Sequence, residues 1–229
     1  MKTVIVTGAN GNLGMAVTRN LLSQGYRVIA TVAGEAERKD FDSSDLLDVR
    51  VVNLMKEEET HAFAQACIGK YGKIDAALLL VGGFTAGNIA ATSGADLRKQ
   101  FALNFETAYF TSRPLFQHML DKNSGRIVYI GGRPALVAEQ GHSLLAYSLS
   151  KSLLFKLAEY LNAEARGKNV SVTVVVPSTL DTALNRKSMP DADPGNWVKP
   201  EQLAEILEFI VSEKGNALRE TVLKVYNNA

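Results

Sequence analysis

The stretch that decides the fold is Thr3–Gly14, which reads TVIVTGANGNLG. A short run of apolar and β-branched residues comes first, and glycines follow at positions 8, 11 and 14. Glycine permits a tight turn and lets backbone N–H groups come close to a bound group. Residues 12–24 then show a helical pattern. We therefore expect a strand, a phosphate-binding turn and a helix whose positive N-terminal end faces the phosphates.

The rest of the chain repeats this alternation of short apolar runs and helical segments. Several of the runs are apolar on both faces, as parallel strands covered by helices require. The pattern predicts an α/β fold: a Rossmann-type, doubly wound, mostly parallel seven-stranded sheet with helices on both faces. The expected strands are 3–6, 27–32, 49–52, 76–81, 126–130, 170–176 and 221–225, and the expected helices are 12–24, 56–71, 94–121, 143–167 and 199–213.

The domain organisation follows from what interrupts this pattern. No internal repeat, low-complexity tract or linker is visible, so we expect a single dinucleotide-binding domain over residues 1–229. One polar segment, about 178–199, follows the sixth strand without a clear periodicity. Ligands of open α/β sheets bind at the carboxyl ends of strands. We therefore interpret this segment as a substrate-loop insertion.

Composition excludes several classes of function. The net charge of +1 gives no electrostatic reason to expect nucleic acid or a membrane surface as a partner. The longest continuous apolar run, Ala76–Val81, is far shorter than the ~20 residues of a membrane span, and we expect a cytoplasmic protein. The single cysteine, Cys67, excludes an intrachain disulfide framework. The three histidines lack metal-ligand spacing, so no metal site is expected.

The second strand bears on the choice of dinucleotide. An acid about twenty residues beyond the glycines normally holds the adenosine ribose. Here the strand ends at Val32 and continues Ala33-Gly34-Glu35, with no acid at the expected place. Glu35 can reach back, or Arg38 and Lys39 can meet a 2′-phosphate, or these charges form a solvated loop. The missing acid favours NADPH over NADH.

A second pattern concerns proton transfer. Tyr147 and Lys151 are four residues apart in a predicted helix and therefore share one face. A phenol with a pKa near 10 exchanges protons slowly at neutral pH, and a neighbouring ammonium, helped by the charge of a nicotinamide ring, lowers that pKa. The pair predicts a proton donor and its cationic assistant.

The glycine turn, Asn104, the Tyr147/Lys151 pair and Pro177 with Thr182 together resemble the short-chain dehydrogenase/reductase family over essentially the whole chain. The resemblance implies strand order 3-2-1-4-5-6-7, hydride transfer with NAD(P), a small-molecule substrate, and homodimers or homotetramers packed through the two long helices. By matching positions, Tyr147 is the proton donor, Lys151 binds the nicotinamide ribose and tunes Tyr147, and Asn104 anchors a relay water. The expected cofactor contacts are Gly8, Asn10, Gly11, Asn12, Leu13, Gly14, Asn53, Leu54, Val81, Gly82, Gly83, Tyr147, Lys151, Pro177, Thr179 and Thr182.

Two departures from the family pattern stand out. Asn12 occupies a position that is glycine in the common form of the turn. More important, Gly132 stands where the family has a catalytic serine that holds the substrate carbonyl. Losing one such donor costs around 3–4 kcal/mol of transition-state stabilisation. Either the protein reduces carbonyls poorly, or its substrate does not need that donor, or Ser143, one turn before Tyr147, replaces it.

A narrower resemblance addresses this gap. The segment 179–193, followed by Trp197, is similar to the corresponding loop of the quinonoid dihydropteridine reductases within this family. So is Val81–Phe84 followed by Gly87-Asn88, and the missing serine is a further shared feature. The resemblance implies reduction of a quinonoid dihydropterin or a similar conjugated substrate. The expected substrate contacts are Gly132, Phe84, His142, Asn185 and Trp197. From their positions, Phe84 and Trp197 either form an aromatic wall for a flat substrate or take part in ordinary packing, and His142 either lines the cleft or lies on a surface loop.

Two other functions remain open at this point. The chain can be a short-chain reductase of another carbonyl, quinone or imine. It can also be a non-catalytic dinucleotide-binding regulator, with Gly132 as a sign of lost catalysis. The retained Asn104, Tyr147 and Lys151 argue against the second alternative, since a sensor has no need of them.

Overall fold

The computed structural model describes residues 1–220 and 222–228. Within them, one all-parallel sheet has the strand order β3-β2-β1-β4-β5-β6-β7, which confirms the predicted fold class and order. The predicted first residue of the last strand, Thr221, lies outside the described residues. The strands are β1 (Thr3–Thr7), β2 (Arg27–Val32), β3 (Leu47–Val51), β4 (Ala76–Leu79), β5 (Gly125–Ile130), β6 (Val170–Pro177) and β7 (Val222–Val225).

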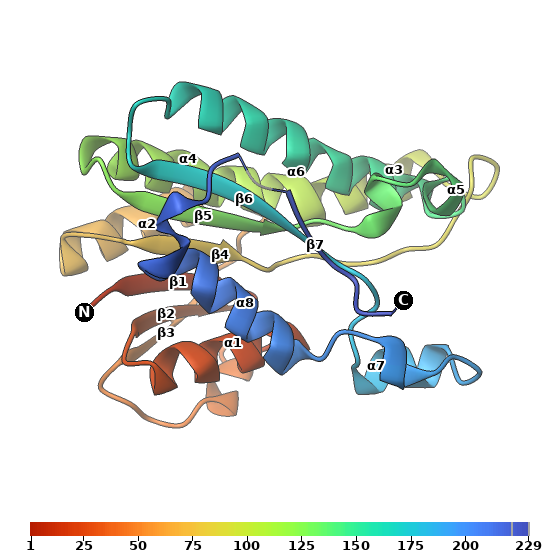
Figure 1. The fold of residues 1–229 in the computed structure, drawn as a ribbon, viewed down its shortest axis with the longest axis horizontal. Coiled ribbons are helices and arrows are strands. Elements are labelled where there is room, and N and C mark those ends of the chain that lie inside the picture. Colours follow the sequence, from red (N-terminus) through yellow and green to blue (C-terminus); the bar gives the residue numbers. More distant parts are fainter. Residues whose placement is uncertain (221, 229) are drawn as a thin grey trace.

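Helices cover both faces of this sheet (Figure 1). On one face α1 packs against α8, and on the other α2 packs against α4 and α3 against α6. The short helices α5 and α7 lie with α3 at the carboxyl end of the sheet, on the right of Figure 1. The helices are α1 (Asn12–Ser23), α2 (Glu57–Tyr71), α3 (Gly94–Phe101), α4 (Thr107–Asp121), α5 (Ala138–Gly141), α6 (Leu145–Glu164), α7 (Ala183–Ser188) and α8 (Pro200–Val211).

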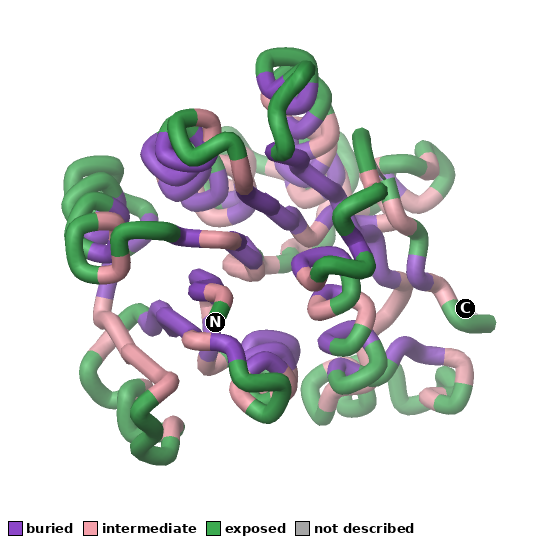
Figure 2. The backbone as a smooth tube through the Cα atoms, turned by 60° about the vertical axis from the view of Figure 1, so that its left-hand side comes forward, coloured by how far each residue is buried: buried purple, intermediate pink, exposed green. Residues whose placement is uncertain are grey.

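Alternate residues of the central strands enter two separate cores. In β1, Val4 and Val6 pack with α1 and α8, whereas Ile5 packs with α2, α4 and α6. Side chains of a strand point to opposite faces in turn, so strands that are apolar throughout need both layers of helices. Figure 2 shows the central strands as buried and the outer turns of the helices as exposed, whereas β3, at one edge of the sheet, is half-buried. This burial fixes the sheet, and with it the positions of the loops at its carboxyl end.

Local signals explain where several helices begin and end. Ser93 and Asp96 form a capping box at the start of α3, with each side chain accepting from the other residue's backbone N–H. Pro200 occupies the first turn of α8, where its missing N–H costs nothing. Gly72 ends α2 with a φ of 71°, a left-handed conformation that favours glycine.

The structure corrects the sequence-based boundaries in two regions. The predicted helix 94–121 consists of α3, a π-helical segment at Ala102–Glu106, and α4. The loop at about 178–199 is not irregular throughout: it contains α7 and a 3₁₀ turn at Pro194–Asn196. Thr182 caps α7 by accepting a hydrogen bond from the backbone N–H of Asn185. Smaller shifts occur in β3, which begins at Leu47, and in β4, which ends at Leu79.

Across residues 1–220 and 222–228, no helix is both long enough and apolar enough to cross a bilayer. The same residues show no grouping of His, Cys, Asp and Glu able to hold a metal ion.

Candidate active site

The glycine turn connects β1 to α1 with almost no free space. Gly8 has a φ of 63°, and its carbonyl accepts a hydrogen bond from the N–H of Gly11 at 3.1 Å. A Cβ atom on Gly14 would stand 2.2 Å from the Gly8 carbonyl oxygen, so no side chain fits there. The N–H of Ala9 donates to the carbonyl of Thr31 at 3.0 Å. The turn is therefore fixed to the carboxyl end of β2.

The start of α1 suits an anion. Its N-cap is Gly11, no side chain caps its free N–H groups, and its first turn contains no acid. The positive end of the helix dipole is thus uncompensated by the protein itself. Gly11 and Asn12 are exposed and Asn10 is half-buried, whereas Leu13 and Gly14 are buried beneath the turn. These residues fit the pyrophosphate of a dinucleotide.

The other residues expected to contact the cofactor lie in segments at the carboxyl ends of the strands. Asn53 and Leu54 follow β3, with Asn53 exposed and Leu54 buried. Val81, Gly82 and Gly83 follow β4, and the N–H of Leu80 donates to Thr7 Oγ1 at 2.9 Å. The remaining three follow or end β6: Pro177, Thr179 and Thr182.

The Tyr147/Lys151 pair lies on α6. Lys151 is 5% exposed, and its Nζ donates to the carbonyl of Ile130 at 2.8 Å. Burial lowers the pKa of Lys151 to about 8. Burial also raises the pKa of Tyr147 to about 12, the direction opposite to the one expected from Lys151 alone. The protein's own groups therefore keep the phenol protonated at neutral pH.

Asn104 is fully buried in the π-helical segment. Its Oδ1 accepts from the N–H of Gly83 at 2.8 Å, and its Nδ2 lies within hydrogen-bond distance of the Gly83 carbonyl, Gln100 Oε1 and Ser150 Oγ. The side chain therefore holds the loop after β4 against α6. The proton-relay water that the family resemblance places at Asn104 stays a prediction. The π-helical segment that places it left no trace in the sequence pattern, although such segments are frequent at functional sites.

Two glycines bring the backbone close to these side chains. A Cβ atom on Gly82 would stand 2.8 Å from Asn104 Oδ1 and 3.0 Å from Lys151 Nζ. A Cβ atom on Gly132 would stand 2.6 Å from the Tyr147 hydroxyl oxygen. The Tyr147 hydroxyl therefore occupies the space in which a side chain at position 132 would begin.

The segment after β4 is joined to the start of α6. Gly87 and Leu144 form a parallel bridge: the N–H of Gly87 donates to Ser143 at 2.9 Å, and the N–H of Leu145 donates to Gly87 at 2.8 Å. Phe84, in the same segment, is 64% exposed, and its ring meets Tyr147 edge-on with 5.3 Å between the ring centroids. An exposed aromatic ring thus lies directly beside the phenol.

Ser143 and three of the expected substrate-contact residues are less favourably placed than Phe84 for contact with a substrate. Ser143 donates its hydroxyl to Gln140 at 3.2 Å, and His142 is exposed just before α6. Asn185 donates its side-chain amide to the carbonyl of Leu180 at 2.8 Å and so stabilises the loop. Trp197 is only 5% exposed, which leaves it little surface for an aromatic wall with Phe84.

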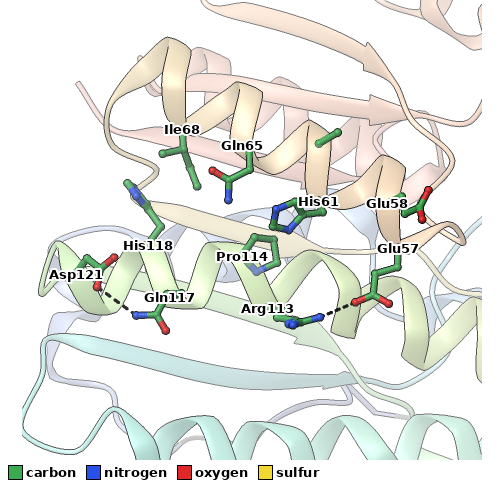
Figure 3. Close-up of a pocket in the computed structure, with 11 residues that line it drawn as sticks. Glu57, Glu58, His61, Gln65, Ile68, Arg113, Pro114, Gln117, His118 and Asp121 are labelled. Carbon is green, nitrogen blue, oxygen red and sulfur yellow. Dashed lines mark hydrogen bonds and ion pairs between the residues drawn. The ribbon is translucent and has the colours of Figure 1, made fainter.

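A separate cavity lies between α2 and α4 (Figure 3). Its volume is about 730 Å³, and polar side chains line most of it. Arg113 crosses it to bind Glu57 at 2.7 Å, and the His118 ring accepts from the N–H of Ile74 at 3.2 Å. None of its lining residues belongs to the glycine turn or to α6. It is therefore distinct from the site described above.

The glycine turn and the Tyr147/Lys151 pair, set on a seven-stranded parallel sheet, form the arrangement that is typical of Rossmann-type dinucleotide-binding oxidoreductases. A family model described as short chain dehydrogenase matches residues 2–193, well over half of the chain. The chain belongs to the short-chain dehydrogenase/reductase family and is an NAD(P)-dependent oxidoreductase.

Individual relatives are more distant. The chain is 28% identical to an acetoacetyl-CoA reductase of Acinetobacter sp. (strain RA3849), covering 93% of this chain and 92% of that protein. It is 25% identical to a 3-oxoacyl-(acyl-carrier-protein) reductase of Rickettsia felis, covering 98% and 95%. Among solved structures, ElxO with NADP bound has a TM-score of 0.91 at 20% identity, covering 98% of this chain and 96% of that one. The aldohexose dehydrogenase of Thermoplasma acidophilum has a TM-score of 0.84 at 22% identity, covering 98% and 92%.

Proposed function

We propose that the protein is an NAD(P)H-dependent reductase of dihydropteridine-reductase type, which reduces a quinonoid dihydropterin or a similar conjugated C=N system. The observation that carries this proposal is the Tyr147 hydroxyl in the space above Gly132. No hydroxyl donor stands at position 132, and the Ser143 hydroxyl is bonded to Gln140. The site is thus poorly equipped to hold a developing alkoxide.

The chemistry of a conjugated imine fits this arrangement. Such a reduction needs a hydride, which the nicotinamide supplies when bound, and a proton delivered to nitrogen. No tetrahedral alkoxide forms, so a serine that stabilises one is unnecessary. Tyr147 remains protonated because burial raises its pKa to about 12, and it is the proton donor in this proposal.

The neighbouring groups hold the reactants. Lys151, whose Nζ donates to the Ile130 carbonyl, would bind the nicotinamide ribose. Asn104 keeps the loop 82–83 against α6, which holds the backbone of Gly82 close to Lys151 Nζ. Phe84, exposed beside Tyr147, stacks on a flat substrate ring. Exposed apolar residues on the two long helices, Tyr109 on α4 and Tyr160 on α6, support assembly into a homodimer or homotetramer.

The direct test is oxidation of NADH and NADPH with a quinonoid dihydropterin generated in the assay. We expect turnover well above the background chemical reduction, and a drop in kcat of about 10²–10⁴-fold in Tyr147→Phe, as for loss of a general acid. Ser143→Ala is the matched control and retains wild-type kcat. Turnover no faster than the background reduction contradicts the pterin proposal.

The relatives favour a second candidate, a reductase of a carbonyl substrate. Their names describe acetoacetyl-CoA and 3-oxoacyl reductases, and they match nearly the full chain. A panel with acetoacetyl-CoA, a quinone, a cyclic imine and the dihydropterin, all measured with the same cofactor, separates the two candidates. A kcat/KM for the thioester that exceeds the value for the pterin supports the carbonyl assignment.

A further inference from the structure

The buried amide of Gln100 connects the segment after β4 to Asn104. Gln100 lies near the end of α3, one helical turn before Asn104, and is 2% exposed. Its Oε1 accepts from Asn104 Nδ2 at 2.8 Å, and its Nε2 donates to Thr85 Oγ1 at 2.8 Å. A buried amide without partners costs free energy, and here both its oxygen and its nitrogen are bonded. The side chain therefore bridges Asn104 and Thr85.

The direction of these hydrogen bonds is fixed by the groups around them. The hydroxyl of Ser150 donates to a backbone carbonyl of α6 at 2.7 Å, so it can only accept from Asn104. Because the N–H of Gly83 donates to Asn104 Oδ1, the amide of Asn104 cannot be reversed. Asn104 Nδ2 therefore faces Gln100, and only the oxygen of the Gln100 amide can accept from it. The Gln100 nitrogen is left to donate to the hydroxyl of Thr85.

The segment that carries Phe84 is held at three points. Two hydrogen bonds with the π-helical segment hold Gly83, and the bridge to the start of α6 holds Gly87. Between these points, the hydrogen bond from Gln100 holds Thr85, the residue directly after Phe84. Loss of that bond therefore frees the middle of the segment while both of its ends stay attached.

We propose that Gln100 is a positioning residue, which acts through Thr85 on the orientation of Phe84. By holding the Phe84 ring edge-on to Tyr147, it sets how tightly the substrate binds. The inference rests on the proposed contact between Phe84 and the substrate, but not on which substrate that is. Asn104 Nδ2 has two hydrogens and three acceptors in reach, so both hydrogens keep a partner without Gln100. The effect of losing Gln100 therefore falls on KM and not on kcat.

The first test compares KM and kcat in matched variants of the full chain. Gln100→Met removes the amide from a side chain of similar size, and Thr85→Val removes the hydroxyl that accepts from it. Thr85→Ser keeps that hydroxyl and is the rescue variant. Gln65→Met, at an exposed position on α2, is the matched control. Each variant is assayed with the quinonoid dihydropterin and with acetoacetyl-CoA, and Gln100→Met also in a Phe84→Ala background. Thermal unfolding confirms that each variant is folded.

We expect Gln100→Met and Thr85→Val each to raise KM about fivefold, as for loss of one hydrogen bond, with kcat within about twofold of wild type. Thr85→Ser and Gln65→Met keep the wild-type KM, and Phe84→Ala alone raises it. In the Phe84→Ala background Gln100→Met changes KM less than about twofold, because the residue through which it acts is gone. An undiminished effect in that background, an unchanged KM in Phe84→Ala, or a fall in kcat without a rise in KM overturns the inference.

The second test needs no substrate. Phe84→Trp in a Trp197→Phe background leaves a single tryptophan at the position of Phe84, and its steady-state fluorescence anisotropy reports local nanosecond motion. We expect Gln100→Met and Thr85→Val to lower this anisotropy and Gln65→Met to leave it unchanged. Equal anisotropy in all of these variants overturns the inference. Failure to reduce the dihydropterin contradicts the pterin assignment alone, since acetoacetyl-CoA still tests the kinetic role. If neither substrate is reduced, the anisotropy decides.

Discussion

The hydroxyl oxygen of Tyr147 lies 2.6 Å from the point where a Cβ atom on residue 132 would stand. The ring atoms Cε1 and Cζ are also close to that point, at 3.1 Å each. Adding the family's serine by Gly132→Ser therefore forces the phenol to move. We expect kcat/KM to fall by about tenfold or more, the effect of misplacing a catalytic group. An increase in kcat/KM on a carbonyl substrate contradicts this view and supports the carbonyl alternative.

Lys151 gives the second prediction, on pH dependence. Burial lowers its pKa to about 8, so it carries its charge below that pH and loses it as the pH rises through 8. We expect kcat/KM to decline above about pH 8. Lys151→Arg, whose guanidinium stays protonated, is slower but lacks this decline. A wild-type profile that stays flat to pH 10 excludes Lys151 as the titrating group.

The buried amide of Asn104 gives the third prediction. Its Nδ2 lies within hydrogen-bond distance of the Gly83 carbonyl, Gln100 Oε1 and Ser150 Oγ, and a carboxylate has no hydrogen to donate to the first two. Asn104→Asp places a buried negative charge against these two oxygens, and we expect a loss of about 3–5 kcal/mol in the free energy of unfolding. Urea denaturation measures this loss. Asn53→Asp, at an exposed position, serves as the control and keeps near wild-type stability.

A cluster on β3 and α2 gives the fourth prediction, on acid stability. Burial of Asp48 opposes its ionisation, but hydrogen bonds from Arg50, Tyr71 and Lys70 outweigh this and hold the pKa of the carboxyl well below its ordinary value. The resulting stability is present above the unfolded pKa of about 4 and is lost as the pH falls below it.

Asp48→Asn removes this contribution. We expect the variant to be less stable than wild type by about 1–3 kcal/mol at pH 7 and the difference to shrink between pH 4 and pH 2. Chemical denaturation at a series of pH values gives both quantities. A difference that is independent of pH shows that packing, not the charge of Asp48, accounts for the loss.

The fold was largely predictable from the sequence because each strand is a short apolar run between helical segments. Alternate residues of β1 enter different cores, and this two-sided burial is what the continuous hydrophobicity of Thr3–Val6 indicated. The glycine turn was also predictable from the sequence, since a side chain at Gly14 would collide with the Gly8 carbonyl. Because a steric restriction of this kind permits few residue types, it leaves a recognisable pattern in the sequence.

The features of the site that the sequence did not predict correctly depend on the three-dimensional position of side chains and not on residue type. The π-helical segment around Asn104 adds a residue to a turn without changing the apolar pattern of the helix. Trp197 has the aromatic side chain expected of a contact to a flat substrate, but this side chain is buried.

The parallel bridge between Gly87 and Leu144 has a consequence for how substrate range can change. Phe84 and Tyr147 are carried by two backbone segments that this bridge joins, so main-chain hydrogen bonds hold the two segments at a set separation. Changing that separation requires breaking the bridge and not only changing a side-chain rotamer. The segment that carries α7 is closed by a different bridge, Leu180–Val198, and exposes Leu184 to solvent. We expect substitutions in that segment to leave the separation of the Phe84 and Tyr147 backbones unchanged.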